Sequence, residues 1–398
     1  MDDNEMYAIS YYGEKYKLGY IEMDFLDCNA VNNYIEESKT EFWTKVKIIS
    51  ADVPYYIYKK FIGEKKKTFE DGSLFVVTFS NKDPQFECYE YFEDNSKRII
   101  QLKITKSIKC DEALRNKIVS GLKDKFDITK YHKVMYEEML HKIKFRKNKK
   151  YKFKVYNVGQ ALATSIQLEN NKPFIYFDYG WDAGNMKMNC ESVLQIDENS
   201  TVIFLSHVDE DHWSGAFSNK KSLKCMWIVP RQNGHAPYQK HLANIIVNNG
   251  VVYWHDNDIN LGSVYFGNSK KSKINNKRNP KTTHQDGYAM YINAYEKINT
   301  MVKKIKITVS GDQDYDYQDD NKYQKSDVLV ACHHGGKYCW SKKFTGINPS
   351  GEKSVIIYSY GAVNCYNHPS KTSDYLGWGW KIEHRTPVDK TYEKDIFF

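Results

Sequence analysis

The sequence predicts an α/β protein in which a layered α/β domain over residues 149–398 follows a smaller α+β domain over residues 1–148. Three observations support this fold class. A chain of 398 residues exceeds the size that one hydrophobic core usually serves, so two domains are expected. A lysine-rich run lies between the two parts. After this run, apolar strand-like segments recur with turns and helix-like segments between them, which is typical of a layered α/β domain.

The first part contains short β-like runs, among them residues 73–80 and 98–106. Helices are predicted around residues 30–37 and 111–145. No residue pattern in this part is typical of catalysis or metal binding. We therefore expect it to bind a partner, such as a regulatory protein, or the substrate.

The second part is predicted to hold the main sheet. Each predicted strand is a short apolar run bounded by turn residues. The strands cover residues 152–160, 163–170, 172–180, 192–196, 201–208, 225–230, 251–255, 263–268, 288–295, 303–312, 326–336 and 353–361. Helices are predicted at residues 213–223 and 241–250.

The composition is that of a soluble globular protein, since 41% of the residues are hydrophobic and 15% are aromatic. No segment approaches the roughly 18 uncharged apolar residues that span a bilayer, and the first residues lack the pattern of a secretion signal. The eight cysteines are scattered without a CxxC pair. A chain of this length does not need disulfides to fold. We therefore expect a cytoplasmic protein, and we exclude a membrane protein.

The net charge of +8 is unevenly distributed, because lysines and one arginine crowd residues 141–154 with aromatic residues between them. Such a run could follow the backbone of a polyanion. It could equally be a solvated linker or an exposed strand edge, which is the more common role of a charge run. The sequence favours the second interpretation and leaves the first open.

The strongest chemical signal follows the apolar segment 201–205. His207, Asp209, Asp211 and His212 lie within six residues, directly after a predicted strand. Carboxylates this close together repel one another when buried, unless a cation neutralises them. Imidazoles and carboxylates that spread from one turn are the ligands that a metal cluster requires. We therefore predict a metal site here rather than a polar surface turn.

Two later strands end in the same kind of residue. Residues 303–309 are followed by Ser310, Gly311 and Asp312, and residues 326–332 are followed by His333 and His334. Taken alone, Gly-Asp after a strand is an ordinary turn, and paired histidines can be one buried and one exposed residue. Their position at strand ends makes them candidates for the same metal site.

The order of these motifs resembles the metallo-β-lactamase superfamily, and within it the hydrolase domain of DNA-uptake proteins of the ComEC/Rec2 type. The resemblance covers roughly residues 151–385. Its motifs match residues 156–162, 178–180, 206–215, 310–312, 333–336 and 361–369. The chain departs from the family pattern at Asn157, Ala161 and Gly336, where the family has Asp, Gly and Ser. The resemblance implies an αββα sandwich of two mixed sheets flanked by helices.

The resemblance also implies a set of metal ligands. His207 and Asp209 would bind a first ion, Asp211 and His212 a second, and Asp312 would bridge them. Either His333 or His334 would complete the second site. We favour His334, with the other imidazole as a residue that orients it.

The superfamily usually has one further histidine ligand between the first cluster and the bridging aspartate. Here the choice stays open. His284 ranks first, His235 second and His255 third, and each alone is more typical of an ordinary surface histidine.

The resemblance implies two divalent metal ions, and the ligand types bear on their identity. Asp209 stands where lactamases have histidine, which makes the first site richer in oxygen. The ions would be zinc or manganese, with magnesium as a further candidate.

The activity that the resemblance implies is metal-dependent hydrolysis, most simply of a phosphodiester by an activated water. Asp211 or Asp312 would orient the water and receive its proton. His368 would donate a hydrogen bond to the substrate or leaving group, although it could instead merely cap its loop. Lys371 and, more weakly, Arg231 are candidate anion contacts.

Three functions remain open from the sequence. The first is a nuclease acting on DNA or RNA, in line with the DNA-uptake resemblance and the basic run. The second is a hydrolase of a small phosphodiester, such as a cyclic nucleotide or a phosphocholine ester. The third is a partner-controlled or non-catalytic metal-binding effector. By analogy of architecture alone, we also considered an effector of bacterial phage defence.

Overall fold

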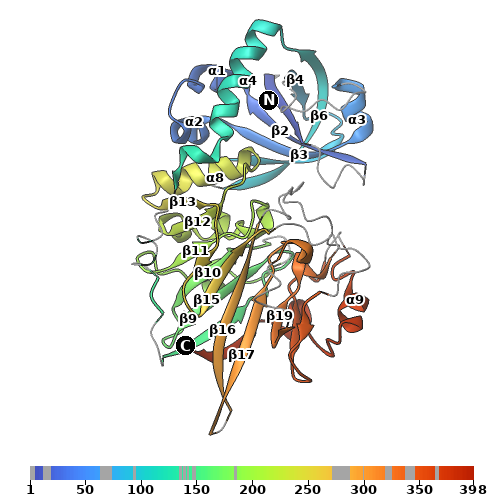
Figure 1. Cartoon of the computed structure of the whole chain (residues 1–398). Coiled ribbons are helices and arrows are strands. Elements are labelled where there is room, and N and C mark those ends of the chain that lie inside the picture. Colours follow the sequence, from blue (N-terminus) through green and yellow to red (C-terminus); the bar gives the residue numbers. More distant parts are fainter. Residues whose placement is uncertain are drawn as a thin grey trace. The chain divides into compact units, whose positions relative to one another are not determined.

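The structure is a computed structural model, and it describes most of the chain (Figure 1). The described residues are 5–11, 19–62, 74–92, 96–133, 137, 140, 143–145, 149–182, 186–270, 287–298, 300–318, 325–336, 346–363 and 367–398.

The chain forms two compact units. Unit 1 comprises Met1–Lys130 and Asn233–Asn248, and unit 2 comprises Tyr131–Gln232 and Asn249–Phe398. The sequence analysis placed a boundary at residue 148 instead. Helix α8 (Ala236–Val247) comes from the middle of the predicted second domain but is counted with unit 1. Unit 1 is therefore built from two separate stretches of the chain.

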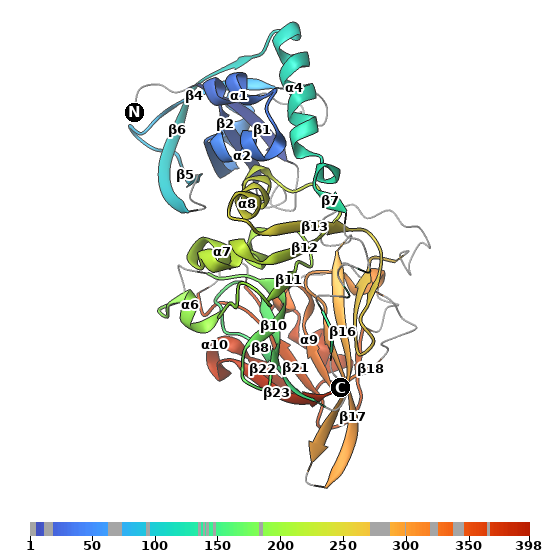
Figure 2. The same cartoon turned by 90° about the vertical axis from the view of Figure 1, so that its left-hand side faces the viewer.

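Unit 1 is built on a closed barrel of antiparallel strands in the order β1-β2-β3-β5-β6-β4 (Figures 1 and 2). Buried and partly exposed residues alternate strictly along β4, as expected for a strand with one face on a core. The core includes Phe25 and Phe79, whose rings meet edge to face at 4.8 Å. The strands are β1 (Glu5–Tyr11), β2 (Tyr20–Asp27), β3 (Ile48–Pro54), β4 (Phe75–Ser80), β5 (Phe86–Tyr91) and β6 (Lys97–Lys109).

The helices of unit 1 begin at side-chain caps that the sequence supplies. Asp27, Ser38 and Asp111 each accept a hydrogen bond from a backbone N–H in the first turn of the helix that follows. The helices are α1 (Cys28–Tyr34), α2 (Lys39–Lys45), α3 (Tyr55–Phe61) and α4 (Glu112–Phe126). The helix predicted to reach residue 145 ends at Phe126, because Asp127 turns to an extended conformation and a 3-10 turn and the short strand β7 (His132–Lys133) follow.

Buried lysines close helix ends in unit 1. Lys240 of α8 is 2% exposed, and its Nζ donates to the carbonyl oxygens of Trp43, Thr44 and Val46 at the end of α2. Lys39 donates to the carbonyl of Asp127 at the end of α4, at 2.8 Å. The last carbonyls of a helix have no partner within it, so these ammonium groups supply the missing donors.

Unit 2 contains one large mixed sheet in the order β22-β21-β19-β17-β16-β23-β8-β9-β10-β11-β12-β13-β7, in which β15 also pairs with β16 and β14 pairs with β15. This confirms a mixed α/β architecture. The strands not yet given are β8 (Lys150–Val155), β9 (Ala163–Leu168), β10 (Pro173–Tyr179), β11 (Val202–Phe204), β12 (Met226–Pro230), β13 (Val251–His255), β14 (Ile259–Asn260), β15 (Val264–Asn268), β16 (Tyr288–Ile298), β17 (Met301–Val309), β19 (Val328–Val330), β21 (Val355–Tyr358), β22 (Ile382–Arg385) and β23 (Tyr392–Phe397). A separate pair, β18 (Lys325–Ser326) and β20 (Asn348–Pro349), completes the set.

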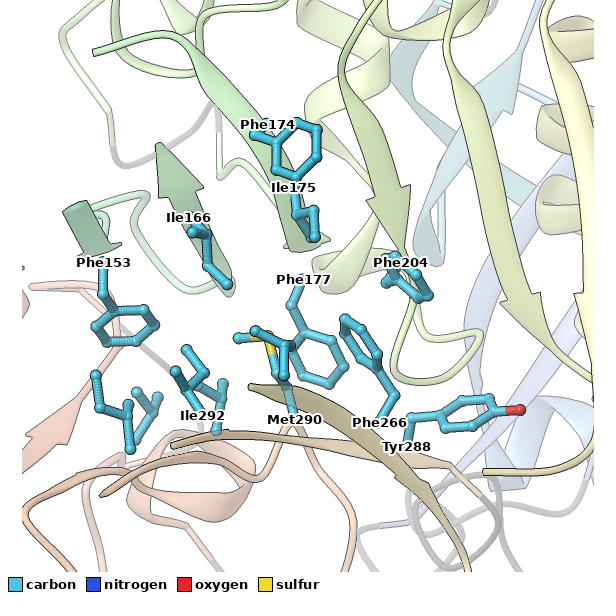
Figure 3. Close-up of a cluster of buried hydrophobic side chains, with 14 of the residues drawn as sticks. Phe153, Ile166, Phe174, Ile175, Phe177, Phe204, Phe266, Tyr288, Met290 and Ile292 are labelled. Atoms are coloured by element: carbon cyan, nitrogen blue, oxygen red, sulfur yellow. The ribbon is translucent and has the colours of Figure 1, made fainter. Parts of the chain in front are cut away.

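Strands from different parts of the large sheet contribute to one hydrophobic core. Figure 3 shows side chains of β10 and β11, such as Phe177 and Phe204, pointing toward those of β15 and β16, such as Phe266 and Met290. The rings of Phe204 and Phe266 stack at 3.9 Å with 7° between their planes. Fully apolar strands are expected where a sheet is buried on this scale.

Among the described residues of unit 2, short helices include α6 (Cys190–Val193), α7 (Gly215–Ser218), α9 (Thr372–Gly377) and α10 (Thr386–Asp389). The strand predicted at residues 192–196 is wrong, because this segment forms the end of α6 and an irregular stretch. Asn189 caps α6 by accepting a hydrogen bond from Glu191, which favours the helix over a strand.

Within the described residues, no helix is both long enough and apolar enough to cross a membrane. The cysteines that the structure describes are free thiols in buried positions. They are Cys28, Cys88, Cys110, Cys190, Cys225 and Cys332.

Candidate metal centre

The polar residues predicted to bind metal follow the ends of strands that run parallel. Strands β10, β11, β12 and β13 are parallel to one another, and so are β17, β19, β21 and β22. Parallel strands place their carboxyl ends at one edge, which is where ligand sites of such sheets form. The segments after β11, β17 and β19 carry His207, Asp312 and His334.

The structure brings five of these residues together as two overlapping groups. In the first group, the ligand atoms of His207, His212 and Asp312 all lie within 4.8 Å of one another. The second group consists of Asp211, His212 and His334 on the same criterion. His212 belongs to both groups, so the two form one cluster that could hold metal ions.

Distances within the first group place Asp312 between two imidazoles. Its Oδ1 atom lies 3.3 Å from Nε2 of His212, and its Oδ2 atom lies 3.9 Å from Nε2 of His207. Asp209 approaches the same His207 nitrogen at 3.5 Å. Asp312 thus contacts both imidazoles of the first group.

The paired histidines both face the cluster. Nε2 of His334 lies 3.0 Å from Oδ2 of Asp211, and Nε2 of His333 lies 3.7 Å from Oδ2 of Asp312. Both residues have positive φ angles, 50° and 56°, in the left-handed region that non-glycine residues seldom adopt. This turn directs two consecutive side chains to the same place, which an extended strand could not do.

The electrostatics of the cluster depend on these contacts. Burial would raise the pKa of Asp211, but the charges of His212 and His334 outweigh it and lower the pKa to about 2. Burial would likewise raise the pKa of Asp312, yet His333 and His212 hold it well below its usual range. Both carboxylates therefore stay ionised at neutral pH.

The histidines respond in the opposite sense. Burial would lower the pKa of His212, but nearby carboxylates, with Asp312 the strongest, raise it well above its usual range. Burial would lower the pKa of His334 too, but the hydrogen bond that its Nε2 donates to Asp211, together with the charges of Asp312 and Asp211, raises it. The imidazoles thus balance the charge of the carboxylates, as a metal ion would do in such a cluster.

Asp178, at the end of β10, orients the cluster from behind. Its carboxylate accepts hydrogen bonds from the backbone N–H and the Oγ of Ser206, at 2.7 and 2.8 Å, and lies 2.8 Å from Nδ1 of His212. A carboxylate that accepts a hydrogen bond from Nδ1 fixes the orientation of the ring, so that Nε2 can face a metal ion. The carbonyl of Ser359 plays the same role for His334, at 2.6 Å from its Nδ1.

The sequence analysis missed the role of Asp178. It matched Asp178, Tyr179 and Gly180 to a family motif but assigned them no contact. Asp178 itself has a φ of 61°, so its carboxylate leaves the strand direction and turns toward Ser206. An Asp directly before a sharp turn at a strand end was the available signal.

A close backbone contact supports the loop of Asp211. A Cβ atom at Gly180 would overlap the carbonyl oxygen of Asp211, so only glycine fits there. The same carbonyl accepts a hydrogen bond from the N–H of Leu162, at 3.1 Å. The predicted turn at residues 156–162 thus packs against the metal loop.

The exposed fractions of the side chains divide the cluster into a buried part and a more exposed part, which we call the open side. The side chains of His207, His212, His334 and Asp312 are at most 3% exposed. In contrast, Asp209 and Asp211 are 39% and 37% exposed, and His333 is 20% exposed. Solvent therefore reaches the cluster over the two aspartates and His333.

The other candidate residues have the following positions. His368 is partly buried, with its ring centroid 5.3 Å from that of His333 and 5.7 Å from that of His334. Burial, reinforced by these two histidines, lowers its pKa to about 3. Lys371 lies in the same loop, and its N–H donates to the carbonyl of Gly335.

Three of the weaker candidates lie elsewhere. Arg231 is 55% exposed and lies 3.7 Å from Asp256. His235 stacks on Tyr11 with ring centroids 3.9 Å apart and is counted with unit 1. His255 is buried at the end of β13 and is in neither of the convergent groups. His284, ranked first as the additional ligand, lies outside the described residues.

The donor set fits divalent metal ions. It combines neutral-type imidazole nitrogens with carboxylates, and the buried Nε2 atom of His212 makes no hydrogen bond of good geometry to a described residue. A buried nitrogen that faces two carboxylates without such a bond is in a suitable state to coordinate a cation. Zinc, manganese and magnesium differ in their preference for nitrogen and oxygen, and the set contains both.

Comparisons with known proteins add little to this description. No protein-family model matches the chain, and no curated protein matches it either. Among solved structures, the chain is similar to a possible metal-dependent hydrolase from Veillonella parvula. The two are 9% identical, the match covers 58% of this chain and 92% of that chain, and the TM-score is 0.29. At this level of similarity, the function has to be argued from the site itself.

Proposed function

We propose that unit 2 is a metallo-β-lactamase-like domain, with the αββα arrangement, and that it hydrolyses phosphodiesters with two divalent metal ions. The observation that carries this proposal is the convergence of Asp211, His212, Asp312 and His334 from three separate strand ends, with His207 in the same cluster. Residues far apart in sequence rarely bring two carboxylates and three imidazoles to one place without a cation to bind.

The proposed ligands divide as follows. His207 and Asp209 would hold one ion, Asp211, His212 and His334 the other, and Asp312 would contact both. When bound, such ions would supply an activated water and polarise the phosphoryl oxygen. Asp178 and the Ser359 carbonyl hold two of the imidazoles in the orientation that this requires. Asp211, which is partly exposed, would orient the attacking water and receive its proton.

A phosphodiester suits the open side of the cluster. Its non-bridging oxygens carry negative charge, which increases near the ions in the transition state. His368 lies beside His333 on this side, where its ring could donate a hydrogen bond to the substrate or the leaving group. These features suit a phosphodiester of either small or large size.

A nucleic acid is our first choice of substrate, because the motifs resemble a DNA-uptake hydrolase. The basic run contributes less than its composition suggests. Lys152 and Lys154 of β8 lie 3.0 and 2.7 Å from Glu393 of β23, and Lys150 lies 2.6 Å from Asp395. These pairs offset part of the charge that could meet a phosphate backbone. This observation keeps a small phosphodiester as the second candidate.

The test is hydrolysis by the full chain after chelation and after return of zinc, manganese or magnesium. Plasmid DNA, single-stranded RNA and a chromogenic bis-aryl phosphodiester would be offered in parallel. We expect cleavage only with metal, and loss of cleavage in Asp211→Asn. Asp83→Asn, an exposed change in unit 1, is the matched control and should leave the activity intact.

The outcomes separate the candidates. Cleavage of the chromogenic ester without cleavage of DNA or RNA would favour the small substrate. Metal binding without cleavage of any substrate would favour a non-catalytic effector. Cleavage that survives both the chelator and Asp211→Asn would refute the proposal.

A further inference from the structure

Two consecutive glycines after the paired histidines lie directly under the loop that carries His368. Gly335 and Gly336 follow His334 without a break, and the structure shows what a side chain at each position would meet. Where the resembled family has Ser, this chain has Gly336. The consequence of this difference is visible only in the packing.

Because Gly336 has no side chain, the His368 ring can occupy the space beside it. A Cβ atom at residue 336 would overlap both Cε1 and Nδ1 of the His368 imidazole. The carbonyl of His333 would also lie 2.8 Å from it. Real Cβ atoms do not tolerate such overlap, so any larger residue would force the ring or the turn to move.

Gly335 holds the rest of the same loop. Its carbonyl accepts hydrogen bonds from the N–H groups of Ser370 and Lys371, both at 3.0 Å. Its φ of 80° is in the left-handed region, and a Cβ atom would lie 2.8 Å from Cβ of Pro369. The two glycines thus fix both the backbone and the ring of the His368 loop.

We call Gly335 and Gly336 the seat of the His368 loop. The seat determines where the His368 ring lies relative to the metal cluster. His333 forms part of the open side of the cluster, and the His368 centroid lies 5.3 Å from that of His333. The imidazole is therefore held where a substrate would enter.

We propose that Gly336 is a positioning residue that admits the His368 imidazole to the open side of the metal cluster, where it binds a substrate oxygen. This inference rests on the proposed hydrolase function for its last step, whereas the position of the ring does not. Restoring the family's residue, in Gly336→Ser, should therefore weaken catalysis rather than improve it.

The first experiment follows the ring without any assay of activity. Histidine side-chain resonances of the full chain would be recorded by NMR, and the His368 signal assigned by its absence in His368→Gln. We expect Gly336→Ala to shift the His368 signal strongly. Gly351→Ala is the matched control, because a Cβ atom there meets nothing within 4 Å. An unchanged His368 signal in Gly336→Ala would overturn the proposal, whatever the enzyme does.

The second experiment is a double-mutant cycle on the metal-loaded protein. Loss of a positioned acid–base or hydrogen-bonding histidine typically costs about 10²- to 10⁴-fold in rate, so His368→Gln should lower kcat within that range. Gly336→Ala should lower kcat in the same direction, with the metal content unchanged. In the His368→Gln background, Gly336→Ala should cost no more than about twofold further, since the group it displaces is already gone.

Independent costs of the two changes would overturn the role of Gly336 in positioning His368. Should Gly336→Ala fold poorly, the double variant Gly336→Ala with His368→Ala removes the ring that the new Cβ would overlap, and it should fold again. If the wild-type chain hydrolyses none of the substrates, the proposed function fails, while the NMR experiment still decides whether the seat exists.

Discussion

The two units bury charged side chains in different ways. In unit 1, Lys240 and Asp24 contact backbone or hydroxyl groups, and the buried Glu90 pairs with the more exposed Lys47 and Arg98. Lys240 donates to three carbonyls, and Asp24, 1% exposed, accepts from the N–H of Ala236 and the hydroxyl of Tyr11. In unit 2, buried carboxylates and imidazoles face one another across the candidate metal centre. A charged group that is hydrogen-bonded to the backbone contributes to the fold, whereas carboxylates and imidazoles that converge on one space form a site that could bind a metal ion.

The largest effect should come from the centre of the cluster. Asp312→Asn keeps the shape of the side chain but removes the charge that contacts both halves. We expect metal-dependent hydrolysis to fall by more than about a hundredfold, because even changes outside the ligand set cost roughly 10- to 100-fold. Metal content by mass spectrometry and initial rates would be measured together. Full activity with a normal metal content would contradict the bridging role.

Asp178→Asn tests the support behind His212. An amide can no longer accept three hydrogen bonds as an anion, so the ring should lose its fixed orientation. We expect metal affinity to weaken by about 10- to 100-fold. A metal titration followed by calorimetry checks this. Asp395→Asn, an exposed change in the same unit, is the control, and an equal effect in both variants would show that the loss is not specific.

Lys240→Met tests the other half of the comparison. The change removes the donor to the carbonyls of Trp43, Thr44 and Val46 and leaves these buried acceptors unsatisfied, at a cost of about 1–3 kcal/mol in unfolding free energy. Denaturant unfolding measures it, with Lys117→Met on the exposed face of α4 as control. Metal affinity should not change. A loss of metal binding in Lys240→Met would break the distinction between the two units.

The most gradual effect is a pH dependence in unit 1. Burial lowers the pKa of Lys39 to about 7, below the value of about 10.4 in an unfolded chain. Between these values the unfolded chain binds the extra proton, so stability should rise with pH, by at most about 1.4 kcal/mol per pH unit. Below pH 7 both states are protonated and the trend should stop. Unfolding free energies of the wild type minus those of Lys39→Met, measured from pH 6 to 10, should show this rise. A difference that stays flat would contradict the shifted pKa.

The sequence was most informative where ligands lie close together along the chain. His207, Asp209, Asp211 and His212 follow one strand, and their convergence requires only a turn. The same logic extended to Asp312 and His334, because each directly follows an apolar strand. Asp178 escaped notice because its contact with Ser206 joins two strand ends and depends on an unusual backbone angle.

Long-range pairing explains what the sequence could not predict. The barrel of unit 1 closes when β1 pairs with β4, and the register of that contact leaves no local signal. The lysines of β8 gain carboxylate partners only because β23, from the C-terminal end of the chain, lies next to β8. From the sequence alone, these lysines therefore appear available to a polyanion, although carboxylates of the neighbouring strand pair with them.

The chain order of unit 1 has a consequence for its synthesis. Helix α8 brings Lys240 to the end of α2 and the N–H of Ala236 to Asp24, yet it is made more than a hundred residues after α4. On the ribosome, the N-terminal barrel would wait for this helix before those groups are satisfied. A fragment that stops at residue 148 would expose the groups that α8 covers, and adding a peptide of residues 233–248 should restore its cooperative unfolding.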